Sequence, residues 1–309
     1  MKHATAILAL IMAFLLAACT SDGDQPAKTR SMYYWSTTFR MDSTKTKFLN
    51  DHQITKLYVR YFDVVKTIGG DNSPNATISF ESPVPEGVEV VPVVFIVNNC
   101  LTGNSQDLAE KIFARVLQMN ETHDIGQVKE LQIDCDWTMK TQKEYFNMLR
   151  QMREMAHRRG ITLSTTIRLH QLSQTPPPAD RGVLMMYNTG DHTDFDCQKP
   201  ILDTKTTLPY LKNLASYKLP LATAYPLYRW DILFRDKRFV GIVHYEGEYP
   251  TLPGDTIVRR EPTFEEIMMA RHAIGKRRND ANGEIILFDL NNANIQRFNH
   301  NSYEKIFVP

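Results

Sequence analysis

The chain has 309 residues, with 36 lysines and arginines against 35 aspartates and glutamates, 42% hydrophobic residues and 23% charged residues. These fractions are typical of globular proteins and exclude disordered and fibrous chains. The balance of charge argues against a nucleic-acid partner, because contact with phosphates requires an excess of basic side chains.

The chain begins with an apolar targeting segment. Lys2 and His3 precede an uninterrupted apolar run over residues 4–18. This run is shorter than the roughly 20 residues of a membrane-spanning helix and fits the core of a signal peptide. It ends in Leu16-Ala17-Ala18-Cys19, which is similar to a bacterial lipobox. We predict that residues 1–18 are a lipoprotein signal peptide and that acyl chains on Cys19 anchor the protein to a membrane. An ordinary secretory signal is the alternative.

A polar tether is predicted over residues 19–32, which include the lipidation site. Asp22 and Asp24 resemble the acidic flank of surface-exported lipoproteins of the Bacteroidetes. Thr20 follows Cys19, so the aspartate that retains lipoproteins in the inner membrane is missing. We expect a lipid-anchored protein of the outer membrane, and the acidic flank favours its outer surface.

Three further cysteines follow the tether, Cys100, Cys135 and Cys197. An odd number in an exported protein leaves at least one free thiol, and the apolar surroundings of Cys135 predict a buried side chain. A disulfide between Cys100 and Cys197 stays open, and the spacings do not fit a zinc site.

From residue 33 onward, short apolar runs alternate with amphipathic helical patterns. Continuous apolar runs are expected for parallel strands that are covered on both faces. Eight such repeats predict an α/β fold, a (β/α)8 TIM barrel, with a doubly wound open sheet as the alternative. The predicted strands are 33–38, 56–62, 89–97, 130–137, 162–169, 183–188, 219–224 and 284–290. The predicted helices are 105–119, 141–158 and 263–275, with weaker patterns over 44–50, 207–217 and 300–307.

Two helices carry predicted end signals. Thr141 with Glu144 and Thr263 with Glu266 have the spacing of capping boxes. Gly160 and Gly275 are predicted to end the same helices, since glycine adopts the left-handed conformation of a C-cap.

Two connections, 64–87 after the second strand and 225–262 after the seventh, are too long for plain loops. Both follow the carboxyl ends of strands, where barrel enzymes build their sites. Aromatic side chains in the second connection are able either to stack on sugar rings or to pack an insertion onto the barrel. They are Tyr225, Tyr228, Trp230, Phe234, Phe239, Tyr245 and Tyr249.

The fourth strand carries two acidic residues in an apolar run. Because strand side chains alternate, Asp134, Asp136 and Thr138 share one face, opposite Ile133, Cys135 and Trp137. The apolar face is expected to meet the surrounding helices, which turns both aspartates toward the barrel axis near its mouth. Two neighbouring carboxylates raise one another's affinity for protons and suit acid–base work; a pair neutralised by arginine inside a packed barrel is the alternative.

Segments of the fourth and sixth strands resemble motifs of family 18 glycoside hydrolases, the chitinase group. That family carries D-x-x-D-x-D-x-E on strand four, similar to Ile133-Asp134-Cys135-Asp136-Trp137. It carries M-x-Y-D on strand six, similar to Met185-Met186-Tyr187-Asn188. The resemblance implies a (β/α)8 barrel that acts on carbohydrate, with Asp136 orienting a substrate acetamido group, Tyr187 hydrogen-bonding it and Asp134 supporting Asp136.

The chain departs from these motifs at several positions. Leu131 and Thr138 stand where the family has its first aspartate and its catalytic glutamate, and Asn188 replaces the strand-six aspartate. Residues 97–100 have no counterpart of the strand-three S-x-G-G. The family's mechanism therefore lacks its general acid here. The candidates to supply one are Asp289, Glu246 and Asp63.

A second resemblance rests on Gln132-Ile133-Asp134 followed by Leu163-Ser164-x-Thr166. These residues are similar to an uncharacterised bacterial barrel family, domain of unknown function 3142. That family implies a barrel and names no reaction.

Further polar and aromatic residues at strand ends are predicted to line a hydrogen-bonding mouth. Arg168 shares a face with Ser164 and Thr166 and is expected to pair with Asp134 or Asp136. Arg60 is expected to share a face with Tyr58 and Phe62 as a second counter-ion. The remaining substrate-binding candidates are His170, Asn188, Asn98, Asp289, Trp35 and Tyr225, and Asn291 and Asn292 are further strand-end amides.

No cofactor is expected, because the chain has no phosphate-binding glycine loop, nucleophile elbow or H-E-x-x-H helix. Asp134, Asp136, His170 and Asp289 offer metal-ligand chemistry, but their spacing does not require a metal.

Three functions stay open from the sequence. The first is a divergent glycoside hydrolase that uses Asp136, Asp134 and Tyr187 as catalytic residues. The second is a glycan-binding barrel without catalysis, which Thr138 favours. The third is a structural or assembly lipoprotein whose barrel charges form an internal network. The expected partners are an oligo- or polysaccharide and, through Cys19, a membrane.

Overall fold

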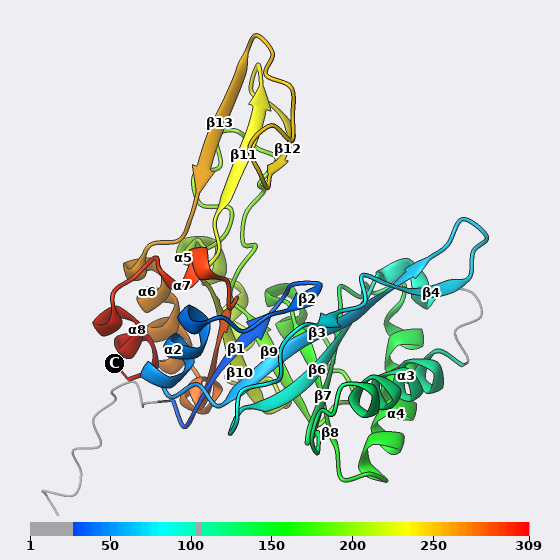
Figure 1. Cartoon of the computed structure of the whole chain (residues 1–309). Helices are drawn as coiled ribbons and strands as arrows, with labels where there is room; N and C mark the ends of the chain where they lie inside the picture. Colours follow the sequence, from blue (N-terminus) through cyan, green and yellow to red (C-terminus); the bar gives the residue numbers. More distant parts are fainter. Residues whose placement is uncertain (1–26, 103–106, 309) are drawn as a thin grey trace, which may run out of the picture.

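The computed structural model describes residues 27–102 and 107–308 (Figure 1). The predicted signal peptide, Cys19 and most of the predicted tether lie outside the described residues. Among the residues that are described, no helix has the length and apolar character needed to cross a membrane.

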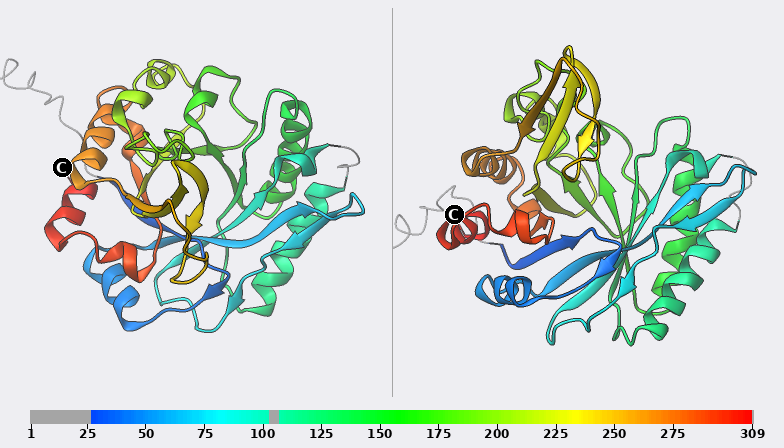
Figure 2. Two further views of the ribbon diagram at one scale, coloured as in Figure 1. Left: turned by 90° about the horizontal axis from the view of Figure 1, so that it is seen from above. Right: turned by 45° about the horizontal axis from the view of Figure 1, so that its top comes forward.

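Eight parallel strands close into a barrel, because the first strand pairs with both the last strand and the second. This closure confirms the (β/α)8 prediction and excludes the open sheet. Helices surround the strands when the barrel is seen from above (Figure 2). The barrel strands are β1 (Thr29–Tyr34), β3 (Lys56–Lys66), β6 (Glu89–Ile96), β7 (Glu130–Cys135), β8 (Thr162–Ile167), β9 (Arg181–Met185), β10 (Leu221–Pro226) and β14 (Glu284–Phe288).

The longer helices that cover the barrel form where amphipathic patterns were predicted, whereas 207–217 does not form one helix and the helix over Asn292–Ile295 was not predicted. Gly160, at φ +68°, follows the helix that ends at His157, and Thr263 and Glu266 make the predicted capping box. The helices are α2 (Ser43–Asp51), α3 (Leu108–Thr122), α4 (Gln142–His157), α5 (Thr204–Thr207), α6 (Phe264–Gly275), α7 (Asn292–Ile295) and α8 (His300–Phe307). Short 3-10 helices are η1 (Asn98–Leu101), η2 (Leu169–Ser173), η3 (Tyr210–Asn213) and η4 (Asn279–Asn282).

Side-chain alternation separates two apolar cores. Ile133, Cys135 and Trp137 lie in the outer core, between the strands and the helices. Tyr33 and Tyr187 belong to the inner core, within the barrel. The predicted orientation of the fourth strand is therefore confirmed, and its acidic face is the inner one.

Ion pairs fill the amino-terminal end of the barrel. Lys56, Glu130, Arg181 and Glu284 are the first residues of four alternate strands. Lys56 Nζ lies 2.6 Å from Glu130 Oε2, and Arg181 Nη2 lies 2.5 Å from Glu284 Oε2. Buried charges are tolerated when they are paired in this way. Because these side chains occupy one end, the hydrogen-bonding groups predicted for the mouth lie at the other.

The two long connections contain strands that the sequence pattern did not predict. Residues 72–75 form β4 (Asn72–Asn75), which pairs antiparallel with β3, and β5 (Ser79–Phe80) pairs with β2 (Thr38–Phe39). In the second connection a three-stranded antiparallel sheet stands up from the barrel (Figure 1). Its strands are β11 (Trp230–Arg235), β12 (Arg238–Val243) and β13 (Asp255–Arg260).

Several predicted boundaries and end signals are wrong. β1 begins at Thr29, because residues 29–32 pair with the last strand and do not belong to a tether. The Thr141 side chain does not cap α4; its hydroxyl donates to Asn98 Oδ1 at 2.6 Å. Gly275 is the last helical residue, and Lys276 forms the C-cap in a right-handed conformation.

Candidate functional site

A cleft lies at the carboxyl ends of the barrel strands and consists of two adjoining pockets that share Tyr187 and Asn188. We call them the acidic half, of about 460 Å³, and the aromatic half, of about 620 Å³. The acidic half is lined by Asp136, Trp137, Thr138, Arg168, Leu169, His170, Met185, Tyr187, Asn188, Thr189 and Tyr210. The aromatic half is lined by Trp35, Tyr187, Asn188, Tyr228, Arg229, Trp230, Asp231, Ile242, Val243, His244, Phe288, Asn291, Ala293 and Asn294.

Arg168 joins the two predicted aspartates in the acidic half. Its Nη2 atom lies 3.2 Å from Oδ1 of Asp134, and its Nε atom donates to Oδ1 of Asp136. The hydroxyl of Thr166, two residues before Arg168, donates a hydrogen bond to the same Asp134 oxygen at 2.6 Å. The predicted pairing is thus present, and it leaves the Asp136 side chain 59% exposed in the cleft.

Burial and charge act in opposite directions on these groups. Burial raises the pKa of Asp134, while Arg168 and the hydroxyl of Thr166 oppose the rise. Burial lowers the pKa of Arg168, but the two aspartates outweigh it and raise that pKa overall. The guanidinium therefore keeps its charge, and Asp136 is held as a hydrogen-bond acceptor next to a permanent cation.

Tyr187 lines both halves of the cleft and carries a hydroxyl with no partner among the described residues. Its hydroxyl is buried and forms no hydrogen bond with any described residue. Burial, reinforced by the nearby Tyr33, raises the pKa of Tyr187, so the hydroxyl stays protonated and able to donate. By contrast, the hydroxyl of Tyr33 donates to Gln132 Oε1 at 2.7 Å. A buried hydroxyl without a partner lowers the stability of the fold. Such groups call for an explanation, and binding of a ligand is one.

Aromatic rings form one wall of the other half. Trp35 and Phe288 lie 5.4 Å apart between ring centroids, and Tyr228 and Trp230 also lie 5.4 Å apart. Trp35 was a predicted site residue and lines the cleft as expected. Phe288 ends the last strand and takes the mouth position, whereas the predicted Asp289 does not line the cleft.

Three other predicted polar residues lie around the mouth. His170 is exposed and lines the acidic half. Asn188 has a left-handed backbone, at φ 55°, and accepts a hydrogen bond from the hydroxyl of Tyr228. Asn98 lies outside the cleft lining, because its side chain binds Thr141.

Arg60 is not the counter-ion of the central aspartates. A bulge between Arg60 and Phe62 breaks the alternation, so Phe62 packs in the outer core instead of sharing the face of Tyr58. Arg60 Nε donates to Asp63 at 2.8 Å, and the guanidinium lies 5.5 Å from the centre of the Trp35 ring.

Tyr225 is also misplaced by the prediction. It is fully buried in the outer core, and its hydroxyl donates to Asn282 Oδ1 at 2.8 Å. It therefore supports the packing of the barrel and does not reach the mouth. The side chains of Tyr228 and Trp230, a few residues further on, take that place.

The candidate proton donors lie apart from the acidic half. Asp63 is tied to Arg60, and Glu246 is exposed in the connection between β12 and β13. Burial raises the pKa of Asp289 to about 6. The hydrogen bond from Asn294, whose Nδ2 lies 2.5 Å from Asp289 Oδ1, lowers this pKa but does not outweigh burial. Thr138 lines the acidic half without an acidic group.

No metal-ligating group forms from Asp134, Asp136, His170 and Asp289 within the described part of the chain. His52, His300 and Glu304 do converge, but on the outside of the barrel, where Glu304 also binds Arg30 at 3.1 Å. Cys100, Cys135 and Cys197 are free thiols, and Cys135 is buried as predicted.

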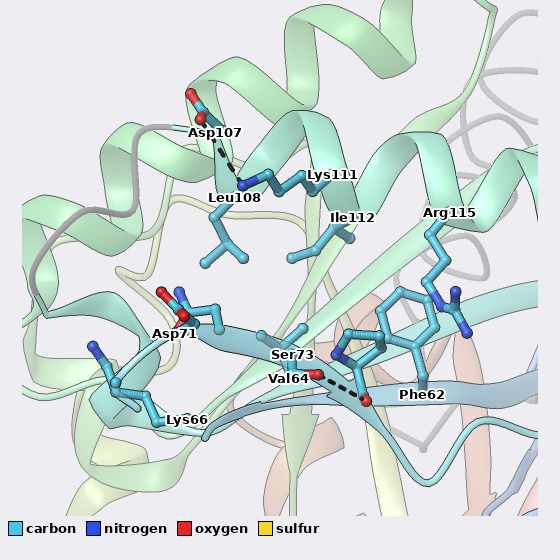
Figure 3. A pocket seen from close by; sticks show the side chains of 13 residues that line it. Phe62, Val64, Lys66, Asp71, Ser73, Asp107, Leu108, Lys111, Ile112 and Arg115 are labelled. Carbon is cyan, nitrogen blue, oxygen red and sulfur yellow. Dashed lines mark hydrogen bonds and ion pairs between the residues drawn. The ribbon is translucent and has the colours of Figure 1, made fainter. Parts of the chain in front are cut away.

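A separate groove of about 360 Å³ lies between the β3–β4 hairpin and α3, away from the residues of the cleft (Figure 3). Phe62, Val64 and Leu108 give it an apolar floor, with Lys66 and Lys111 at its rim. It contains none of the predicted catalytic or substrate-binding residues.

Sequence reasoning missed Arg229, Tyr210 and Phe288 as cleft residues. Phe288 follows the inner-facing Ile286 by two positions, so strand alternation was the available signal. Arg229 and Tyr210 lie in connections, and their positions depend on how the antiparallel sheet and η3 fold onto the mouth.

Comparison with known proteins defines the fold. No family model and no curated protein matches the sequence. The spore cortex-lytic enzyme SleL of Bacillus cereus superposes with a TM-score of 0.57 and 14% identity, over 93% of this chain and 76% of that one. A chitinase from Bacteroides thetaiotaomicron superposes with a TM-score of 0.58 and 12% identity, over 91% and 96% of the two chains. Ostrinia furnacalis Group IV chitinase, in complex with allosamidin, gives a TM-score of 0.55 and 10% identity over 91% and 97%.

The class that the fold defines is therefore a chitinase-like (β/α)8 barrel, similar in architecture to glycoside hydrolases of the family 18 type. At these sequence identities the likeness establishes the fold alone.

Proposed function

We propose that the cleft at the barrel mouth binds an oligosaccharide or polysaccharide. One observation carries the proposal: Asp136, with an exposed carboxylate, and Tyr187, with an unpaired buried hydroxyl, line the same cleft. The carboxylate is fixed by Arg168 as an acceptor, and the hydroxyl is available as a donor. Sugar hydroxyl and amide groups need both kinds of partner, placed on rigid strands.

The aromatic half supports the same proposal. Trp35, Tyr228 and Trp230 present rings next to polar groups, which suits ligands that have an apolar face and polar edges. The structural neighbours named as chitinases, including the one in complex with allosamidin, are consistent with a carbohydrate ligand for this chain.

Binding without hydrolysis fits the geometry best. The acidic residues that line the cleft among the described residues are Asp136 and Asp231, and each is ion-paired with an arginine. A carboxylate that is ion-paired with a guanidinium is a poor proton donor. Thr138, at the position of the acid in the chitinase motif, has a hydroxyl that is far too weak an acid to serve as the proton donor.

Hydrolysis is the second candidate, and one observation favours it. Asp289, whose pKa is raised to about 6 by burial, lies beneath Asn294, which lines the aromatic half. A carboxylic acid with such a pKa suits general acid catalysis. Its use would require a movement of Asn294 that exposes the carboxyl group to the ligand.

We also propose that acyl chains on Cys19 anchor the protein in the outer membrane, with the mouth directed away from the bilayer. The lipobox-like sequence supports the anchor. The orientation is supported by Ala27, whose backbone N–H donates to Phe307 at 2.8 Å, and by Thr29, which pairs with the first residue of β14. Residue 27, with which the described chain begins, therefore lies at the amino-terminal end of the barrel, opposite the cleft.

The proposal is tested by incubating the purified protein with chitin oligosaccharides, peptidoglycan fragments and host and plant glycans. Binding and new reducing ends are measured in parallel, together with Asp136→Asn. Binding that is weakened in the variant, without new reducing ends, supports the binding function. New reducing ends that Asp289→Asn abolishes would establish hydrolysis. If the protein neither binds nor cleaves any of these glycans, the proposal fails and the ion pairs keep only a structural role.

A further inference from the structure

We propose that the bound carbohydrate is anionic and that Arg229 binds its carboxylate or sulfate group in the aromatic half of the cleft. This inference rests on the proposed carbohydrate-binding function and names the chemical class of the ligand.

Of the described residues that line the aromatic half, three have basic or carboxylate side chains, and two of these already have partners. They are Arg229, Asp231 and His244. Asp231 accepts two hydrogen bonds from Arg259, at 2.7 and 2.9 Å, and His244 Nδ1 lies 3.1 Å from Glu248 Oε1. Arg229 is exposed and forms no hydrogen bond or ion pair with any described residue. A ligand that enters this half therefore meets an unpaired guanidinium.

The neighbouring charges do not neutralise Arg229. Asp231 lies near it, but the hydrogen bonds from Arg259 are the main reason why the pKa of Asp231 is lowered, with Arg229 a smaller influence. Burial lowers the pKa of Arg297, and the positive charge of the nearby Arg229 lowers it further. The carboxylate near Arg229 is thus already bound by Arg259, and Arg297 adds a further positive charge near Arg229.

The acidic half constrains where an anionic group can bind. Arg168 already pairs with Asp134 and Asp136, so the described residues that line the acidic half include no unpaired arginine or lysine for an anionic ligand group. The exposed carboxylate of Asp136 would repel such a group. The neutral part of the ligand is therefore assigned to Asp136 and Tyr187, and its acidic group to Arg229. The shared residues Tyr187 and Asn188 join the two halves, so one oligosaccharide can occupy both.

Guanidinium chemistry suits this role. Arginine presents several N–H donors in a planar fork, which matches the paired oxygens of carboxylate and sulfate groups. Trp230 follows Arg229 in the chain and lines the same half of the cleft, so a sugar ring and its acidic group meet an aromatic ring and a guanidinium in one pocket.

The test compares matched pairs of charged and neutral oligosaccharides by isothermal titration calorimetry. One pair is oligogalacturonate and its methyl ester, and the other is chondroitin sulfate oligosaccharide and its desulfated, carboxyl-reduced form. We expect the protein to bind at least one charged member at least 10-fold more tightly than its neutral partner. The pair that responds distinguishes carboxylate from sulfate recognition.

Substitution locates the contact. Arg229→Ala is expected to remove most of the preference for the charged ligand, and Arg229→Lys to keep part of it. Arg238→Ala is the matched control, because Arg238 is an 83% exposed arginine of the antiparallel sheet that follows Arg229 and does not line the cleft. An Arg229→Ala effect that Arg238→Ala reproduces would indicate a general charge effect and overturn the assignment.

Two outcomes separate this inference from the proposed function. If charged and neutral members bind equally and Arg229→Ala changes neither, the inference is overturned while carbohydrate binding stands. If no member of either pair and no glycan of the wider panel binds, the proposed function fails together with the inference that depends on it.

Discussion

Nη2 of Arg168 lies 3.2 Å from Oδ1 of Asp134, on the neighbouring strand. The same guanidinium contacts the exposed Asp136, so one arginine links a carboxylate inside the barrel to a carboxylate in the cleft. Arg168 therefore couples the stability of the fold to the proposed ligand binding. The predictions below separate the two contributions.

Arg168→Met is expected to destabilise the fold by about 3 to 5 kcal/mol, because it leaves the buried Asp134 without its cation. Urea unfolding at pH 7 measures this loss. With its cation absent, the pKa of Asp134 rises further. The folded variant then binds a proton more tightly than the unfolded chain, and the loss shrinks as the pH falls.

The double variant Arg168→Met/Asp134→Leu serves as the control for that loss. Removing both partners leaves no uncompensated charge, so much of the stability should return. A single Arg168→Met variant as stable as the wild type would show that the pair does not contribute to folding.

Tyr187→Phe is expected to lower the affinity for a carbohydrate ligand without lowering the stability of the unliganded protein. The hydroxyl has no internal partner, so its removal costs no hydrogen bond in the free state. Loss of a ligand hydrogen bond should reduce affinity by about 0.5 to 1.5 kcal/mol, or roughly 2- to 10-fold. Thermal unfolding and titration calorimetry measure the two effects.

Tyr225→Phe is the matched comparison, because its hydroxyl binds Asn282 in the outer core. It should lose stability and keep ligand affinity, which is the opposite pattern. Equal behaviour of the two variants would mean that Tyr187 is only a packing residue.

Asp289 is expected to make the fold less stable as the pH rises from 4 to 7. Its folded pKa is raised to about 6 from the ordinary value of 3.8, so the folded state binds a proton more tightly than the unfolded chain. Stability from this group is complete near pH 4 and is lost as the pH passes 6, at a cost of about 3 kcal/mol.

Asp289→Asn removes that cost and keeps an oxygen to accept the hydrogen bond from Asn294. The variant should match the wild type at pH 4 and exceed it in unfolding free energy at pH 7. Denaturant unfolding at the two pH values is the measurement. A difference that does not depend on pH would contradict the raised pKa.

The barrel and its central polar residues were predictable because strand alternation is a local rule. The apolar residues Ile133, Cys135 and Trp137 fixed the orientation of the fourth strand, and Asp134 followed from them. Arg168 was predicted in the same way, from Ser164 and Thr166 on the next strand. In both strands the pattern continues without interruption to the mouth.

The errors arise where local rules are interrupted. The bulge between Arg60 and Phe62 turns Phe62 outward and gives Arg60 the partner Asp63. The antiparallel sheet formed from 230–260 was predicted only as a long connection, since its strands pair with one another and have weak apolar patterns. The aromatic half depends on how that sheet meets the barrel, which is a tertiary property.

The most direct test of carbohydrate binding uses the three tryptophans of the chain. Trp35 and Trp230 line the aromatic half, whereas Trp137, at the wall of the acidic half, is 1% exposed and packs in the outer core. We would titrate the protein with the glycan panel and follow tryptophan fluorescence. The account predicts a saturable change that Asp136→Asn shifts to about 10-fold higher ligand concentration or more, and that Trp35→Phe/Trp230→Phe abolishes. No saturable change with any glycan, or a change that persists unaltered in both variants, would contradict it.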